Sequence, residues 1–144
     1  MSKMLMIEDN AKYSSEISST LRGFCQLHTT SSAAIGINLA NANNYDLIMI
    51  DVNMKTESSG LETVQSIKRA GNNSFIPIVA FSITKLIADK DFLFLHGFTH
   101  IISEPFNIRN FAQQIKFILS SRQKDNYFSH HLTESEPLIP KVVY

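Results

Sequence analysis

Short apolar runs alternate with amphipathic segments along most of this chain, and that alternation narrows the fold more than any other feature. Five runs predict β-strands, at residues 3–7, 25–29, 46–50, 76–81 and 99–103. The first, third and fourth runs are almost continuously apolar, which is typical of parallel strands that helices cover on both faces. A one-faced antiparallel sheet fits poorly, because its strands would alternate apolar and polar side chains.

The segments between these runs have helical spacing. Apolar side chains after the first strand recur at intervals of three or four, at Tyr13, Ile17, Leu21 and Phe24. A second stripe of apolar side chains ends before Gly71, which is expected to stop that helix. The longest apolar stripe lies within residues 108–119. Ser31 or Ser32, and Thr84, are expected to cap two shorter helices. Strand and helix thus alternate five times, which predicts a doubly wound α/β fold: a five-stranded parallel sheet with helices on both faces.

Size, charge and cysteine content exclude several classes of protein. The chain has 144 residues, of which 44% are hydrophobic, as expected of one globular domain. Lys plus Arg and Asp plus Glu number 13 each, so net charge provides no general attraction to nucleic acid or to an anionic membrane. The single Cys25 excludes an internal disulfide, and no apolar run is long enough to span a membrane. With no export signal at its start, the protein is expected to be cytoplasmic.

The helical pattern fails beyond about Arg122. We therefore assign residues 1–122 to the domain and 123–144 to a C-terminal tail. A disordered end is expected there, although its last residues are apolar enough to pack on a neighbour or on the domain itself. The adjacent His130 and His131 are interpreted as surface residues, because no second cluster has metal-ligand spacing.

Acidic residues follow two of the predicted central strands. Glu8 and Asp9 follow the first strand and Asp51 follows the third. In open parallel sheets, ligands bind beyond the carboxyl ends of the strands. If these two strands are neighbours, the three carboxylates and the Asn53 backbone gather there, and a hard cation, most simply Mg²⁺, relieves their repulsion. In the structural alternative, Asp9 or Asn10 simply caps the first helix.

Polar groups also close the fourth and fifth strands. Ser82 ends "IPIVAFS", and "SEPF" closes the fifth strand, with Pro105 just before the final helix. A hydroxyl beside a metal-bound carboxylate is suited to hydrogen-bonding an anion held there. Ser82 could equally be a helix-entry residue with no partner.

Taken in order, these motifs resemble the receiver domain of two-component response regulators, over nearly everything but the tail. The resemblance rests on "MIEDN", "LIMIDVNM", "IVAFS" and "GFTHIISEPF". It implies the flavodoxin-like (βα)5 fold, with Asp51 as phosphoryl acceptor and Ser82 in contact with the phosphoryl group. Glu8 and Asp9 would help to hold Mg²⁺, together with the backbone carbonyl of Asn53. The implied partners are a histidine kinase or phosphotransfer protein and a downstream protein.

One departure from the family concerns charge. Receivers place a lysine before the proline that follows the fifth strand, where its ammonium pairs with the phosphoryl oxygens, and this chain has Glu104 there. Two unit charges about 4 Å apart interact by about 4 kcal/mol at an intermediate dielectric, so the exchange works against a phosphorylated state. Glu104 could instead turn outward, pair with a lysine such as Lys85, or join the metal site.

Three smaller departures also concern the phosphorylation pocket. Ile101 stands where the family has a switch aromatic, and the bulky Ile83 follows the hydroxyl where a small residue is usual. Lys55 replaces a typical proline in the loop after the acceptor, and it could supply the missing cation.

We therefore expect a single-domain receiver without an output domain. It would not be an enzyme, beyond at most its own dephosphorylation, and it would signal by protein–protein interaction. The alternative is a pseudo-receiver that acts as a constitutive docking module. A small Mg²⁺-dependent aspartyl phosphatase fits poorly, because those enzymes carry a second acid where this chain has Asn53.

The expected contact face combines the last helix with the segment Leu86–Phe98. Residues 92–95 are four consecutive apolar side chains, which one helical stripe cannot bury together. The excess suggests a homodimer or a partner interface, and the alternative is a helix buried more deeply than usual.

Overall fold

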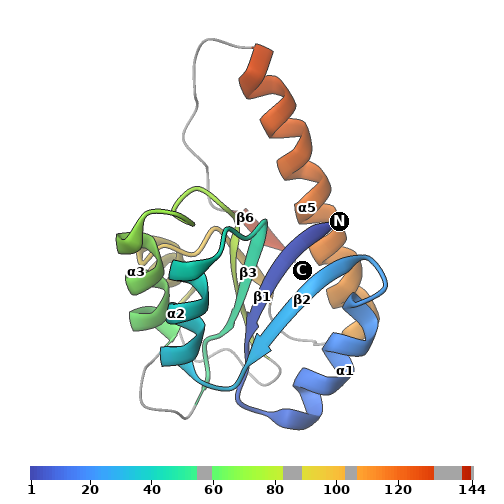
Figure 1. The fold of residues 1–144 in the computed structure, drawn as a ribbon, viewed down its shortest axis with the longest axis vertical. Coiled ribbons are helices and arrows are strands. Elements are labelled where there is room, and N and C mark those ends of the chain that lie inside the picture. Colours follow the sequence, from blue (N-terminus) through green and yellow to red (C-terminus); the bar gives the residue numbers. More distant parts are fainter. Residues whose placement is uncertain (55–59, 83–88, 103–106, 132–140, 144) are drawn as a thin grey trace.

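One parallel sheet with helices on both faces forms the body of the protein (Figure 1). The computed structural model describes residues 1–54, 60–82, 89–102, 107–131 and 141–143, and beyond residue 121 it describes the backbone alone. The strands are β1 (Ser2–Ile7), β2 (Cys25–Thr30), β3 (Leu47–Asp51), β4 (Ile78–Phe81), β5 (His100–Ile102) and β6 (Lys141–Val143). The helices are α1 (Ala11–Leu21), α2 (Ala33–Ala42), α3 (Gly60–Ala70), α4 (Lys90–Leu95) and α5 (Ile108–His131). Within these ranges, no helix is both long and apolar enough to cross a membrane.

The sheet has the strand order β2-β1-β3-β4-β5-β6, and all its pairs are parallel. After β1 the chain forms β2 on one side and then returns to form β3 on the other, so the strand order reverses between β1 and β3. Helices α1 and α5 cover one face, whereas α2 and α3 cover the other (Figure 1). The predicted doubly wound fold is thereby confirmed.

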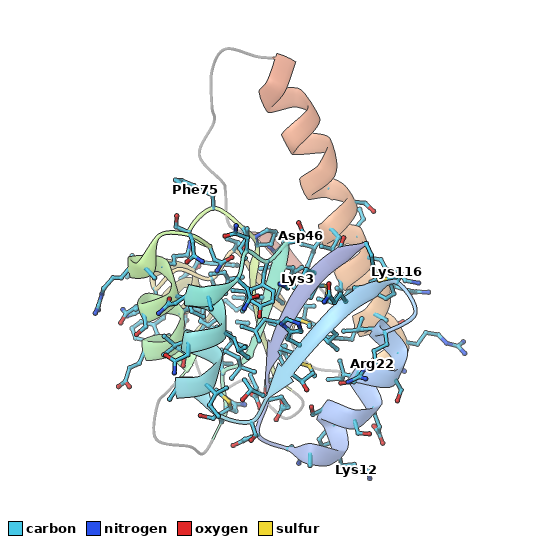
Figure 2. All side chains as sticks on the ribbon, viewed as in Figure 1. Lys3, Lys12, Arg22, Asp46, Phe75 and Lys116 are labelled. Atoms are coloured by element: carbon cyan, nitrogen blue, oxygen red, sulfur yellow. The ribbon has the colours of Figure 1, made fainter. Side chains whose placement is uncertain are left out.

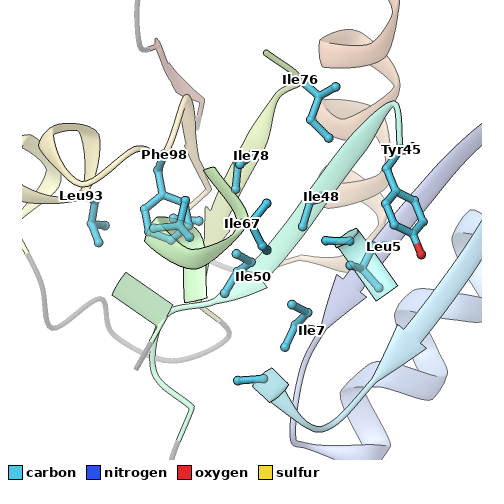
Figure 3. Close-up of a cluster of buried hydrophobic side chains, with 14 of the residues drawn as sticks. Leu5, Ile7, Tyr45, Ile48, Ile50, Ile67, Ile76, Ile78, Leu93 and Phe98 are labelled. Carbon is cyan, nitrogen blue, oxygen red and sulfur yellow. The ribbon is translucent and has the colours of Figure 1, made fainter. Parts of the chain in front are cut away.

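The central strands bury side chains in two separate layers. In β1, Leu5 and Ile7 face the layer beneath α2 and α3, whereas Met4 and Met6 face the layer beneath α1 and α5. All four are completely buried. Figure 3 shows the first layer, in which isoleucines of β3 and β4 continue the row begun by Leu5 and Ile7. This two-sided burial explains why the strand lacks the polar alternation of a half-exposed sheet.

Local signals mark the ends of the first three helices. Asn10 caps α1, where its side chain accepts two backbone amides of the first turn at 3.1 and 3.2 Å. Ser32, rather than Ser31, caps α2. Gly71 follows α3 with a φ of +92°, which glycine adopts without strain. Because Asn10 provides the α1 cap, Asp9 is not needed for that role.

Helix α4 distributes its apolar run over two environments. Leu93 is fully buried and Phe94 packs on the core, whereas Phe92 and Leu95 are 44% and 82% exposed. Asp89 caps this helix, with an oxygen that accepts the Asp91 amide at 2.8 Å. The predicted cap Thr84 and the start of the predicted contact segment, residues 86–88, lie outside the described residues.

The C-terminal part of the chain differs from the expectation of a disordered tail. Helix α5 continues to His131 and projects beyond the sheet, and Lys141–Val143 then forms β6 beside β5 (Figure 1). The register places His100 opposite Lys141 and Ile102 opposite Val143. The outer edge of β5 would otherwise present unpaired backbone groups, which an extended segment can satisfy.

Candidate functional site

Three carboxylates meet beyond the carboxyl ends of β1 and β3. These strands are direct neighbours, with Ile7 opposite Ile50, so the residues that follow them emerge side by side. Ligand oxygens of Glu8, Asp9 and Asp51 all lie within 4.8 Å of one another. Glu8 and Asp51 are buried, at 2% and 3% exposure, and Asp9 is half-buried. The structure thus brings together the acidic residues that the sequence analysis placed at this edge.

Burial makes the ionised form of this cluster costly. It raises the pKa of Glu8 to about 9, assisted by a hydrogen bond with Asp51 and by repulsion from its acidic neighbours. Burial also raises the pKa of Asp51, against the lowering effect of hydrogen bonds from Glu8 and from the Asn53 amide. A hydrogen bond between the two carboxyl groups exists only while one of them carries a proton, because two carboxylates can only accept, and with both ionised Glu8 Oε2 has no partner. The site is therefore suited to hold either a shared proton or a cation.

The donor set fits a divalent cation with a preference for oxygen. Glu8 Oε1 accepts the Asn10 amide at 2.9 Å, but Glu8 Oε2 is buried without a hydrogen-bond partner. Two oxygens bound to one Mg²⁺ lie at most about 4.2 Å apart, so carboxylate oxygens that all lie within 4.8 Å of one another are close enough for one ion. A bound cation would supply the missing partner of Glu8 Oε2.

Asn53 links the ends of β3 and β4. Its backbone amide donates to Asp51 Oδ1 at 2.8 Å, and its side-chain Nδ2 donates to Ser82 Oγ at 2.6 Å. Asp51 lies opposite Phe81 in the sheet, so Ser82 follows the paired position and is completely buried. The resemblance to receivers implies a role in the site only for the backbone carbonyl of Asn53. Its side-chain contact has no local sequence signal, because it joins residues that only the sheet brings together.

Several predicted positions lie outside the described residues. These are Glu104, Lys55, Ile83, Lys85 and Pro105, so the interpretations that depend on them remain predictions.

The position expected for the switch aromatic is described. Ile101 lies in β5, is completely buried, and belongs to the core layer beneath α2 and α3. A hydrocarbon side chain therefore fills this position.

The family of the chain follows from comparison with known proteins. Residues 4–116 match the model of the response regulator receiver domain. The chain belongs to this family, whose members act in two-component signal transduction and share the property of phosphorylation on an aspartate.

Curated relatives contain the same domain within longer proteins. The chain is 27% identical over 124 residues to the heme response regulator HssR of Staphylococcus epidermidis. This match covers 85% of this chain and 54% of that protein. It is 31% identical over 144 residues to histidine kinase P4 of Formosa agariphila. This second match covers 98% of this chain and 10% of the kinase. The chain thus spans about half of the regulator and a small part of the kinase.

Solved structures share the fold. The chemotaxis response regulator CheY4 of Vibrio cholerae superposes with a TM-score of 0.74 at 23% identity, covering 82% of this chain and 98% of that one. The receiver domain of the sensor histidine kinase PA1611 of Pseudomonas aeruginosa has a TM-score of 0.72 at 19% identity. The superposition covers 83% of this chain and 98% of that domain. That domain was solved with a magnesium ion coordinated in its active-site cleft.

Proposed function

We propose that this receiver accepts a phosphoryl group on Asp51 and passes the signal on through protein–protein contacts. The observation that carries the proposal is the buried Asp51 carboxylate, grouped with Glu8 and Asp9 and linked through Asn53 to the Ser82 hydroxyl. The donor is a histidine kinase or phosphotransfer protein, the class of partner that the family implies. The domain is a signalling module in the cytoplasm rather than an enzyme with an external substrate.

The transfer needs one nucleophile and no redox partner. A carboxylate oxygen of Asp51 forms a bond to phosphorus, while the bond from phosphorus to the donor nitrogen breaks and leaves its electron pair on that nitrogen. The Asn53 amide holds Asp51 Oδ1 and so keeps the carboxylate in one orientation. The Ser82 hydroxyl donates a hydrogen bond to a phosphoryl oxygen of the product.

Glu8, Asp9 and Asp51 are the residues that would hold Mg²⁺ at this site, and the donor set and the unpartnered Glu8 Oε2 support that assignment. The Asn53 backbone carbonyl is the further ligand that the family implies. When bound, the ion would screen the charge of the incoming phosphoryl group. The magnesium in the PA1611 receiver is consistent with this choice of ion.

The partner surface is proposed on α4. Phe92 and Leu95 expose apolar side chains there, and exposed apolar groups of this size are suited to a downstream protein. A second copy of the chain is the alternative occupant, and native sizing with and without a phosphoryl mimic distinguishes a homodimer from a monomer.

A second candidate function is a pseudo-receiver that docks its partner without phosphorylation. Two features of the chain favour it: Glu104 replaces the family lysine, and Ile101 replaces the switch aromatic with a buried hydrocarbon side chain. Both functions use the same fold, but only one needs Asp51 as a nucleophile.

Incubation with acetyl phosphate and Mg²⁺, followed by intact mass measurement, separates the two. Phosphorylation predicts an adduct in the wild type that Asp51→Asn abolishes. Asp46→Asn is the matched control, because Asp46 precedes the same strand and accepts the Lys3 amide at the opposite end of the sheet (Figure 2). A wild type without an adduct, together with an adduct in Glu104→Lys, would establish the pseudo-receiver.

A further inference from the structure

We propose that the Asn53 side chain is a positioning residue that holds the Ser82 hydroxyl as a hydrogen-bond donor towards the phosphoryl group on Asp51. The inference rests on the proposed function, and it concerns how the chain prepares the site before any phosphoryl group arrives.

The direction of one hydrogen bond carries the proposal. Asn53 Nδ2 lies 2.6 Å from Ser82 Oγ, and an amide nitrogen can only donate. Ser82 Oγ therefore accepts at this contact, and its own proton must point away from Asn53. Because Ser82 is completely buried, bulk water does not compete for the hydroxyl. The Asn53 amide thus restricts the directions in which the hydroxyl can donate.

The backbone holds the two residues together independently of this contact. The Val52 amide donates to the Phe81 carbonyl at 3.1 Å, which extends the pairing of β3 and β4 one step beyond Asp51. The Asn53 amide also donates to Asp51 Oδ1. Neither bond involves the Asn53 side chain, so a substitution there can remove the contact with Ser82 and keep the backbone around Asp51.

Orientation before binding matters because a preorganised donor needs no reorganisation when charge arrives. Without the Asn53 amide, this restriction on the direction of the Ser82 hydroxyl proton is lost. Donation to a phosphoryl oxygen then carries a larger orientational cost. Removal of the Asn53 side-chain amide should therefore weaken binding of the phosphoryl anion. It should leave cation binding unchanged, since a side-chain substitution keeps the Asn53 backbone carbonyl.

The test compares the beryllofluoride affinity of the full chain at saturating Mg²⁺ in the wild type, Asn53→Ala, Ser82→Ala and the double variant. Ser82→Ala should weaken binding roughly tenfold, as expected for one hydrogen bond to a charged group, and Asn53→Ala should weaken it by a smaller factor, because the hydroxyl remains. The double variant should bind no more weakly than Ser82→Ala. Mg²⁺ affinity without beryllofluoride should stay within about twofold across the set, a result that general damage to the site would not give.

Asn53→Leu controls for packing, because leucine fills a similar volume without a donor. It should bind beryllofluoride as weakly as Asn53→Ala, and wild-type affinity in either variant would overturn the proposal. The proposal would also be overturned if Asn53→Ala weakened beryllofluoride binding as much in the Ser82→Ala variant as in the wild type, since Asn53 would then act independently of Ser82. A wild type that fails to bind beryllofluoride at all would instead refute the phosphoryl-accepting function itself, and this inference with it.

Discussion

Glu8 and Asp51 present buried carboxyl groups to each other at the ends of the adjacent strands β1 and β3, and Glu8 Oε2 has no hydrogen-bond partner. Two buried carboxyl groups in contact are stable only if a proton or a cation lies between them. The arrangement therefore favours cation binding at the expense of the stability of the metal-free domain. Three of the predictions below depend on this relationship.

Replacing the ionisable carboxyl group of Glu8 with an amide should stabilise the metal-free protein. Glu8→Gln supplies an amide that can donate to Asp51, so we expect a gain of about 1–3 kcal/mol, the usual cost of an unsatisfied buried group. For a chain of this size each kcal/mol raises Tm by roughly 2–4 °C. The measurement is thermal unfolding in EDTA, with the exposed Glu16→Gln as control, which should change stability by less than about 0.5 kcal/mol.

The same variant should remove a pH dependence of stability. The pKa of Glu8 rises from its ordinary value of 4.5 to about 9 in the folded protein, so the unfolded chain loses this proton first. The contribution of Glu8 to the free energy of unfolding is fully present below pH 4.5, and it is lost as the pH rises towards 9. The advantage of Glu8→Gln should therefore be larger at pH 8 than at pH 5, and equal gains at both would contradict the assignment.

Mg²⁺ affinity should increase with pH. A cation binds the carboxylate form, so it must displace the proton that the raised pKa retains on Glu8 at neutral pH. We expect calorimetric titrations at pH 7 to show proton release, detected as a binding enthalpy that depends on the ionisation enthalpy of the buffer. An affinity that is the same at pH 6 and pH 8.5, with no proton release, would show that Glu8 is already ionised.

The buried amide of Asn73 should be far more important for stability than its exposed neighbour Asn72. Asn73 accepts the Tyr45 amide at 2.9 Å and donates to the Ala40 and Asn43 carbonyls at 2.6 and 3.0 Å. Asn73→Ala leaves the buried Tyr45 amide unpaired, so we expect a loss of about 2–4 kcal/mol in urea unfolding. Asn72 donates to the same two carbonyls from an exposed position, where water can replace it. Asn72→Ala should therefore cost less than about 1 kcal/mol.

Strand β6 should protect the backbone of β5. Deleting residues 132–144 removes the strand that pairs with His100–Ile102, and the β5 amides that it protects should then exchange with solvent at least roughly tenfold faster. Hydrogen exchange of the full and shortened chains measures this directly. Amides of β2, the opposite edge strand, are the internal control and should not change. Unchanged exchange in β5 would mean that β6 does not pair there in solution.

Features that depend on a few neighbouring residues could be predicted from the sequence. The unbroken apolar run of β1 indicated burial on both faces, because a covered parallel strand has no solvent-facing side. Ser32 was one of two expected caps, and Gly71 was the expected end of α3. The gathering of Glu8 with Asp51 was also foreseen, but only on the condition that β1 and β3 pair.

Short-range sequence patterns are sufficient to predict the strand and helix alternation, the two-sided core and the acidic residues at strand ends. Each follows from side-chain chemistry at short range along the chain. Three features depend instead on long-range packing: Asn53 donates a hydrogen bond to Ser82, Phe92 and Leu95 rather than Leu93 remain exposed, and the C-terminal residues extend the sheet. These contacts join distant segments, and they form where packing and unpaired backbone groups bring those segments together, which no short stretch of sequence encodes.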